Sequence, residues 1–196
     1  MTKAEDTREK ILERAVVLAR HVGLEGVTLG TLATETGLSK SGLYAHFQSK
    51  ENLQLEIIKL SAEQFADEVF RPAIQEPRGL PRVQAIFWGW MEWVRKPGGC
   101  VFIAASSELD DRPGPLRDEL VRQQKLLLES LERSAKIAVA EGHFRRGLDT
   151  AQLAFELNAI LVGYSHLHRL IADPRAETRA RKAFEALIAR SLPAQS

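Results

Sequence analysis

The sequence has one cysteine, few prolines and glycines, and no long hydrophobic run. A lone Cys100 cannot form an internal disulfide, which excludes a disulfide-stabilised secreted scaffold and is consistent with a reducing compartment. Eight prolines and 13 glycines in 196 residues exclude collagen-like and low-complexity chains. With 44% hydrophobic residues, the chain is long and apolar enough to bury a sizeable core.

The sequence shows no segment for export or for crossing a membrane. Residues 1–10 are polar and mixed in charge, and no apolar stretch follows them. The most apolar long stretch, residues 151–172, is interrupted by polar and charged residues, among them Gln152, Glu156 and Arg169. We therefore predict a cytoplasmic protein with no membrane partner.

The charges nearly cancel, with 27 Lys and Arg against 26 Asp and Glu. Within residues 1–50 the balance is seven cations against six acids. No global positive field therefore draws the chain onto nucleic acid, and any DNA binding must come from the placement of individual residues.

Apolar residues recur at three- and four-residue spacing, which predicts an all-α protein. The first segment shows this spacing in Ile11, Ala15, Leu18, Ala19 and Val22. Glycines, prolines and capping residues divide the chain into about nine helices. We expect them at residues 7–22, 28–36, 39–46, 49–69, 80–95, 101–109, 116–141, 150–171 and 174–191, with Pro174 at a first helical position.

The helix lengths predict two functional domains. Two short helices lie close to the N-terminus, and the fourth helix opens with Ser49 as its cap and Glu51 near its positive end. We predict a small N-terminal domain over residues 1–48 and a larger helical body over residues 49–196, joined by the continuous fourth helix.

Residues 28–47 have the pattern of a helix-turn-helix, with a tight Thr36-Gly37-Leu38 turn between two short helices. Gly37 can take the left-handed conformation that ends the first helix, Leu38 and Leu43 are expected to pin the second helix to the core, and Ser39 is suited to cap it. An ordinary helical hairpin is the alternative. The outward residues favour DNA recognition, because short donors and one cation suit base edges and phosphates; they are Lys40, Ser41, Gly42, Tyr44 and His46.

Three segments of the N-terminal part carry a recognisable pattern: Gly-Val-Thr at 26–28, Gly-Leu-Ser-Lys-Ser-Gly-Leu-Tyr-Ala-His-Phe at 37–47 and Ser-Lys-Glu-Asn-Leu at 49–53. Through these segments the sequence resembles the TetR/AcrR family of transcriptional regulators. The resemblance is close over residues 8–55 and diffuse beyond them. It implies a three-helix DNA-binding head, an effector-binding body, and a homodimer formed mainly by the last two long helices.

The resemblance also implies roles for single residues. Thr28 would hold a phosphate, three residues of the second helix would approach the bases, and three further residues would contact the DNA backbone. Phe47 is interpreted as a core wedge. The DNA-binding set comprises Thr28 and Ser39, the base-facing Lys40, Ser41 and Gly42, and the backbone-gripping Tyr44, His46 and Lys50.

Aromatic residues of the body, with a few polar ones, are candidates for an apolar effector pocket. For any single one, a place in the core or in an interface is the alternative. The candidates are Phe65, Phe87, Trp90, Trp93, Phe102, Phe155, Asn158 and Tyr164.

The other reactive side chains give no second site. Cys100 is either a thiol sensor or a buried small residue. Neither the pair His166 and His168 nor the pair Asp110 and Asp111 has the arrangement of a metal site, and no cofactor motif is present.

Together, these features predict a non-enzymatic, ligand-responsive repressor. It would bind a palindromic operator in double-stranded DNA as a homodimer and be released by a small, largely apolar effector. The alternatives are an all-α small-molecule-binding enzyme and a helical scaffold with no DNA role. Against an enzyme, the sequence has no nucleophile elbow and no glycine-rich phosphate loop.

Overall fold

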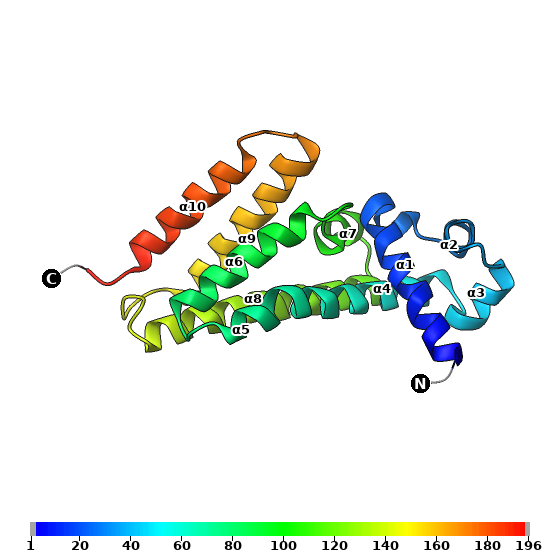
Figure 1. Ribbon diagram of the computed structural model, residues 1–196, viewed down its shortest axis with the longest axis horizontal. Helices are drawn as coiled ribbons and strands as arrows, with labels where there is room; N and C mark the ends of the chain where they lie inside the picture. Colours follow the sequence, from blue (N-terminus) through cyan, green and yellow to red (C-terminus); the bar gives the residue numbers. More distant parts are fainter. Residues whose placement is uncertain (1–2, 195–196) are drawn as a thin grey trace. The chain divides into compact units, whose positions relative to one another are not determined.

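A computed structural model describes residues 3–194, and within this range it contains nine helical segments and no strand (Figure 1). This confirms the all-α prediction. The segments are α1 (Lys3–Gly26), α2 (Leu29–Thr36), α3 (Lys40–Phe47), α4 (Lys50–Phe65) continued by η1 (Ala66–Phe70) and α5 (Arg71–Gln75), α6 (Leu80–Arg95), α7 (Val101–Leu109), α8 (Pro115–Ala140), α9 (Thr150–Ser165) continued by η2 (His166–Leu170), and α10 (Ala176–Ser191).

The described chain packs into two compact units. Unit 1 contains the residues up to Gln64 together with Lys96–Gln123, and unit 2 contains Phe65–Arg95 together with the residues from Gln124 onward. Unit 1 is larger than the predicted 1–48 head, because α7 and the start of α8 contribute to the same hydrophobic core as α1 to α4. The functional division at residue 48 remains a prediction about which residues bind DNA.

The core of unit 1 holds the helix-turn-helix in place. Leu32 of α2 and Leu43 and Phe47 of α3 are buried against apolar residues of α1, α4 and α7. Leu38, however, is 40% exposed, so its predicted role as a pin was wrong. It lies in the turn before α3, and Leu43 and Phe47, four residues apart, already fill the inner face of that helix.

Val22 also departs from the expected stripe of α1, since it is 49% exposed. A Cβ at Gly26 would lie 2.8 Å from the Val22 side chain, which shows that Val22 faces its own last turn and not the core. The inner face of α1 is formed by Ile11, Ala15 and Ala19, with Leu18 partly buried against it.

Several helix boundaries differ from the prediction, and α1 spans Lys3–Gly26 where residues 7–22 were expected. The fourth helical segment continues past Val69 to Gln75 through a π-helical turn in which Arg71 N–H donates to the carbonyl of Ala66. Pro72 follows that turn inside α5 and does not end the segment, because the regular hydrogen-bond ladder is already interrupted there.

The final helix begins at Ala176 and not at Pro174. Asp173 turns the chain before it: its carboxylate accepts from Arg175 N–H at 2.9 Å and pairs with Arg179. The preceding segment ends in a π-helical turn at Leu170, one residue before the expected end.

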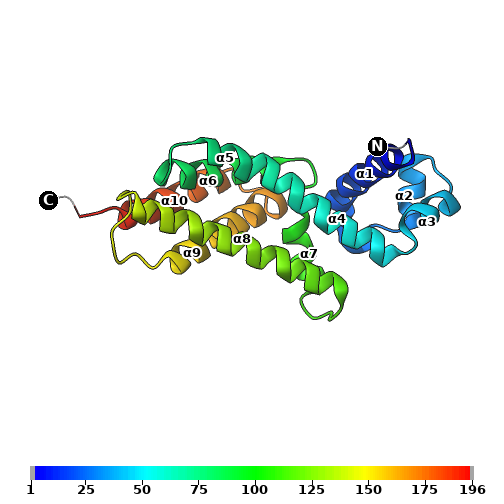
Figure 2. The same ribbon diagram turned by 90° about the horizontal axis from the view of Figure 1, so that it is seen from below.

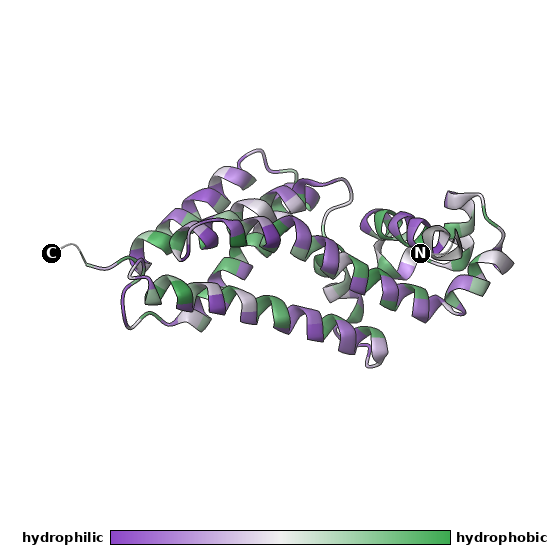
Figure 3. Cartoon of the chain, turned by 60° about the horizontal axis from the view of Figure 1, so that its bottom comes forward, coloured by the Kyte–Doolittle hydropathy of each residue, from purple (hydrophilic) through white to green (hydrophobic). Residues whose placement is uncertain are grey.

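Unit 2 is built on α6, α9 and α10. The last two run side by side (Figure 1), and the rings of Phe87 on α6 and Phe184 on α10 stack at 3.8 Å between centroids. Hydrophobic and hydrophilic residues alternate in bands along the helices (Figure 3), as expected for amphipathic helices that bury one face.

A break in α1 matters for the site. Gly23 has φ 77° and ψ 168°, a conformation that is essentially restricted to glycine. A Cβ there would lie 2.2 Å from Oε1 of Glu108, whose carboxylate accepts the N–H groups of Leu24 and Glu25 at 3.2 and 2.9 Å. These bonds satisfy amides that the break leaves without a helical partner.

We expect Gly23→Ala to lower the free energy of unfolding by about 1–3 kcal/mol, because alanine strains this backbone and displaces the Glu108 carboxylate. Urea denaturation measures the change. Gly37→Ala is the control: Gly37 also has positive φ, 69°, but a Cβ added there would meet nothing within 4 Å, so only the backbone cost of about 1 kcal/mol should appear. A Gly23→Ala variant as stable as wild type would contradict the prediction.

Candidate nucleic-acid interface

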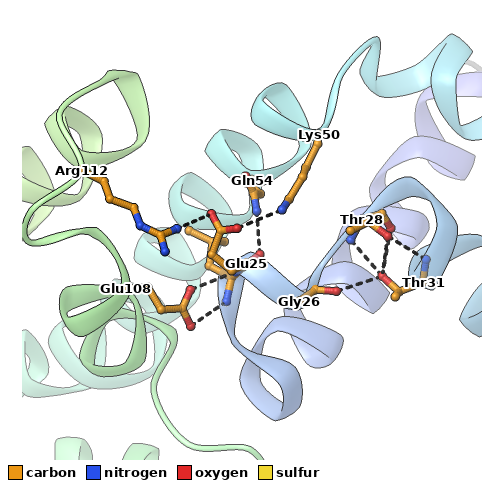
Figure 4. A network of polar contacts seen from close by, with 9 residues as sticks. Glu25, Gly26, Thr28, Thr31, Lys50, Gln54, Glu108 and Arg112 are labelled. Atoms are coloured by element: carbon orange, nitrogen blue, oxygen red, sulfur yellow. Dashed lines mark hydrogen bonds and ion pairs between the residues drawn. The ribbon is translucent and has the colours of Figure 1, made fainter.

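The first helix of the helix-turn-helix begins with a reciprocal cap. Thr28 Oγ1 accepts from Thr31 N–H at 3.0 Å, and Thr31 Oγ1 accepts from Thr28 N–H at 2.8 Å (Figure 4). Thr31 also donates to the carbonyl of Gly26 at 3.1 Å. These bonds satisfy otherwise free amides and fix the start of α2 relative to the end of α1.

The turn and the second helix form as the sequence predicts. Gly37 ends α2 in the left-handed conformation, with φ 69° and ψ 12°, and Ser39 Oγ accepts from Gly42 N–H at 3.1 Å to cap α3. Figure 2 shows α2 and α3 next to each other at the N-terminal end of the chain. Ser39 is thus occupied in capping, and its hydroxyl also contacts that of Ser41 at 3.1 Å.

The outer face of α3 is accessible. Lys40 and Ser41 lie one turn before Tyr44 on it, all three are exposed, and Tyr44 is 58% exposed. Gly42 is exposed as well, whereas His46 is half-buried beside Phe47. The structure therefore brings the predicted base-facing residues and Tyr44 together on one surface.

Gly30 contributes to this surface in a way that sequence reasoning missed. A Cβ at Gly30 would lie 3.4 Å from Cε and 3.6 Å from Nζ of Lys40, so the lysine stem crosses directly over the glycine. The only sequence signal is a glycine inside a short helix, where it lowers helix propensity without an evident local reason.

Lys50, the last predicted DNA contact, is half-buried at the start of α4, where Ser49 Oγ accepts from Asn52 N–H at 3.0 Å. Its ammonium group pairs with Glu25 Oε2 at 3.1 Å (Figure 4). Sequence reasoning missed this partner, because the two residues are 25 positions apart and belong to different helices.

The predicted effector residues are only partly brought together. In unit 2, the ring of Phe65 lies edge to face with those of Trp90 and Trp93, with 5.3 and 5.5 Å between ring centroids. Phe87 and Tyr164 are buried and Asn158 is half-buried. Phe102 belongs to unit 1 and packs against the core of that unit.

Phe155 does not line the interior of unit 2, since it is 61% exposed. The inward face of α9 is formed by Leu153, Leu157, Leu161 and Tyr164, and a residue two positions from Leu153 and Leu157 points away from that face. Its place in an effector pocket stays a prediction.

Polar contacts join the helices of unit 2 beside these aromatic residues. Arg95 Nε donates to the Tyr164 hydroxyl at 3.2 Å, and the guanidinium also pairs with Glu177 of α10. The hydrogen bond from Arg95 holds the pKa of the Glu177 carboxyl below its ordinary value, and the bond to Tyr164 raises the pKa of Arg95.

Within the described residues, no group of three or more His, Cys, Asp or Glu side chains is placed to bind a metal ion, and no helix is long and apolar enough to span a membrane. Cys100 is buried just before α7, which favours the structural alternative over a sensor.

Comparison with known families identifies both parts of the chain. Residues 11–57 match the bacterial regulatory proteins of the tetR family, and residues 79–184 match the tetracyclin repressor-like C-terminal domain. The chain belongs to the TetR family. It is a ligand-responsive DNA-binding transcriptional regulator, as the sequence predicted.

Individual relatives of this TetR-family chain are distant but similar over most of its length. The HTH-type transcriptional repressor AcnR of Corynebacterium glutamicum is 26% identical over 170 residues, 83% of this chain and 81% of the relative. The nucleoid occlusion factor SlmA of Vibrio cholerae is 26% identical over 141 residues, 71% of this chain and 70% of the relative. A TetR transcriptional regulator from Chloroflexus aurantiacus has a similar crystal structure, with a TM-score of 0.85, 26% identity and 96% coverage of both chains.

Proposed function

We propose that this TetR-family regulator is a homodimeric repressor that binds an inverted-repeat operator and is released by a small, largely apolar effector. The observation that carries the proposal is the exposed face of α3, where Lys40, Ser41 and Tyr44 stand outward on a helix fixed by its Ser39 cap and its buried Leu43. Such a helix can enter a major groove with its donors toward base edges and phosphates.

The proposed DNA contacts keep the roles implied by the sequence. Lys40, Ser41 and Gly42 approach the bases, while Thr28, Tyr44, His46 and Lys50 contact phosphates. Ser39 supports recognition through its cap, which sets the direction of α3. Repression, as opposed to activation, is supported by the relative AcnR, whose name describes a transcriptional repressor.

Exposed apolar side chains support a dimer formed by α9 and α10. Phe155, Val162 and Leu170 on the α9 segment, Ile171 just after it and Leu192 just after α10 are all exposed. Large exposed apolar side chains along one helix and just after its neighbour are typical of a subunit interface, where a second copy would bury them.

The apolar effector is supported by the aromatic cluster of unit 2. Phe65, Trp90 and Trp93 lie edge to face, and the buried Trp90 Nε1 makes no hydrogen bond within the described residues. An acceptor on an otherwise apolar ligand would satisfy this donor. Phe65 also ends α4, the helix whose other end carries Lys50, so ligand binding there acts on the segment that continues into the head.

The proposed role is regulatory and not enzymatic, and we propose that the protein acts in the cytoplasm, where its operator lies.

Selection of bound duplexes from a random pool tests the proposed operator binding. We expect an inverted repeat whose half-sites lie about one helical turn apart or slightly more, because two symmetry-related α3 helices must enter major grooves on one face of the duplex. Enrichment of single asymmetric sites, or of no sequence at all, would contradict the proposal.

A further inference from the structure

Glu25 lies between two cations of unit 1. Its Oε2 is 3.1 Å from Lys50 Nζ, and its Oε1 is 3.3 Å from Arg112 Nη1 (Figure 4). Lys50 is a residue that the proposed function assigns to a DNA phosphate. The ammonium group of Lys50 therefore already has an anionic partner within the protein.

Two side chains hold the backbone of Leu24 and Glu25 in place. The Glu108 carboxylate accepts the N–H groups of Leu24 and Glu25, at 3.2 and 2.9 Å, and Gln54 Nε2 donates to the carbonyl of Leu24 at 2.7 Å. Gln54 is buried and lies one turn after Lys50 on α4. The same helix thus fixes both the lysine and the peptide that carries its counter-ion.

We propose that Glu25 competes with an operator phosphate for the ammonium group of Lys50. This competition limits the affinity of the protein for DNA. When Lys50 turns to a phosphate, its bond to Glu25 is lost, and Arg112 retains the carboxylate. The inference rests on the proposed function, because it assumes that Lys50 contacts operator DNA.

The expected size follows from the exposure of the pair. The side chains of Lys50 and Glu25 are 40% and 43% exposed, so solvent screens their attraction. Pairs of this kind contribute about a 1.4- to fivefold change in an equilibrium constant. Because a dimer carries two pairs, removing the competitor should raise operator affinity by about two- to 25-fold.

The experiment is a double-mutant cycle measured by fluorescence anisotropy on the selected operator duplex, over a range of salt concentrations. Glu25→Gln should bind more tightly than wild type, with the gain largest at low salt. In a Lys50→Gln background the same substitution should have a much smaller effect, because the lysine that it releases is absent. Glu35→Gln is the matched control, since it removes one exposed negative charge from α2 of the same head.

An equal gain from Glu25→Gln in both backgrounds, or from Glu35→Gln, would show long-range charge repulsion only and overturn the inference. Thermal unfolding checks that each variant folds. If Glu25→Gln does not fold, Arg112→Gln provides the test. It should weaken DNA binding, because Glu25 would then pair with Lys50 alone. This effect should vanish in the Lys50→Gln background. A wild-type protein that binds no duplex would overturn the proposed function and this inference with it, whereas tight wild-type binding unchanged by Glu25→Gln would overturn the inference alone.

Discussion

Tyr44→Ala is expected to weaken operator binding roughly hundredfold while leaving the stability of the protein nearly unchanged. A hydrogen bond to a charged group contributes about 1.5 kcal/mol or more, and the dimer would lose two, which gives about 3 kcal/mol. Because Tyr44 is 58% exposed, truncating it removes little buried surface, and the change in unfolding free energy should stay within about 0.5 kcal/mol. Anisotropy on the selected duplex and urea denaturation measure the two quantities.

Tyr44→Phe separates the contributions of the hydroxyl and the ring. If the hydroxyl donates to a phosphate, the phenylalanine variant should lose most of the affinity that the alanine variant loses. A large loss of stability in Tyr44→Ala would instead make Tyr44 a structural residue, and unchanged affinity would remove it from the DNA-contacting surface.

Features of the head that depend on residues close in sequence could be predicted from the sequence. Ser39 caps α3, and Gly37 ends α2 with positive φ, because a cap or a tight turn is decided within three or four residues. The burial of Leu43 and Phe47 follows from helical spacing. Leu38 was misassigned because it lies in the turn, where helical spacing does not determine burial.

The polar network around Glu25 could not be predicted in this way. Glu108 reaches Leu24 across 84 positions, and Lys50 reaches Glu25 across 25. Gly23 allows the Glu108 contact through a backbone conformation that the sequence presents only as one glycine among others near a helix end. The packing of α7 against α1, which creates this contact, depends on tertiary structure.

The effector set shows a similar division. The three-residue steps of α6 place Phe87, Trp90 and Trp93 on its buried side, as periodicity suggests. Phe155 was included for its residue type, although its register on α9 directs it outward. Composition alone therefore selects aromatic residues without separating an interior cluster from an exposed face.

Operator DNA is expected to weaken effector binding by the same factor by which the effector weakens operator binding. An effector that favours a conformation with the two α3 helices at the wrong separation acts only through its differential affinity for the two conformations. A hundredfold loss of DNA affinity therefore requires about 2.7 kcal/mol of preference. Since both ligands bind one protein, thermodynamic linkage makes this coupling reciprocal.

The measurement needs one ligand, found by a thermal-shift screen of apolar compounds that carry a hydrogen-bond acceptor. Calorimetry then gives its affinity with and without a saturating operator duplex, and we expect the two dissociation constants to differ by about a hundredfold if release is effective. A Trp90→Phe variant is the control for the pocket, because it keeps an aromatic ring at the buried position beside Phe65 but lacks the Nε1 donor. It should weaken effector binding and leave operator affinity without effector unchanged. Equal effector affinities with and without operator would refute the switch for that ligand, even if the ligand occupied the aromatic cluster, because a ligand with no preference between conformations shifts no equilibrium.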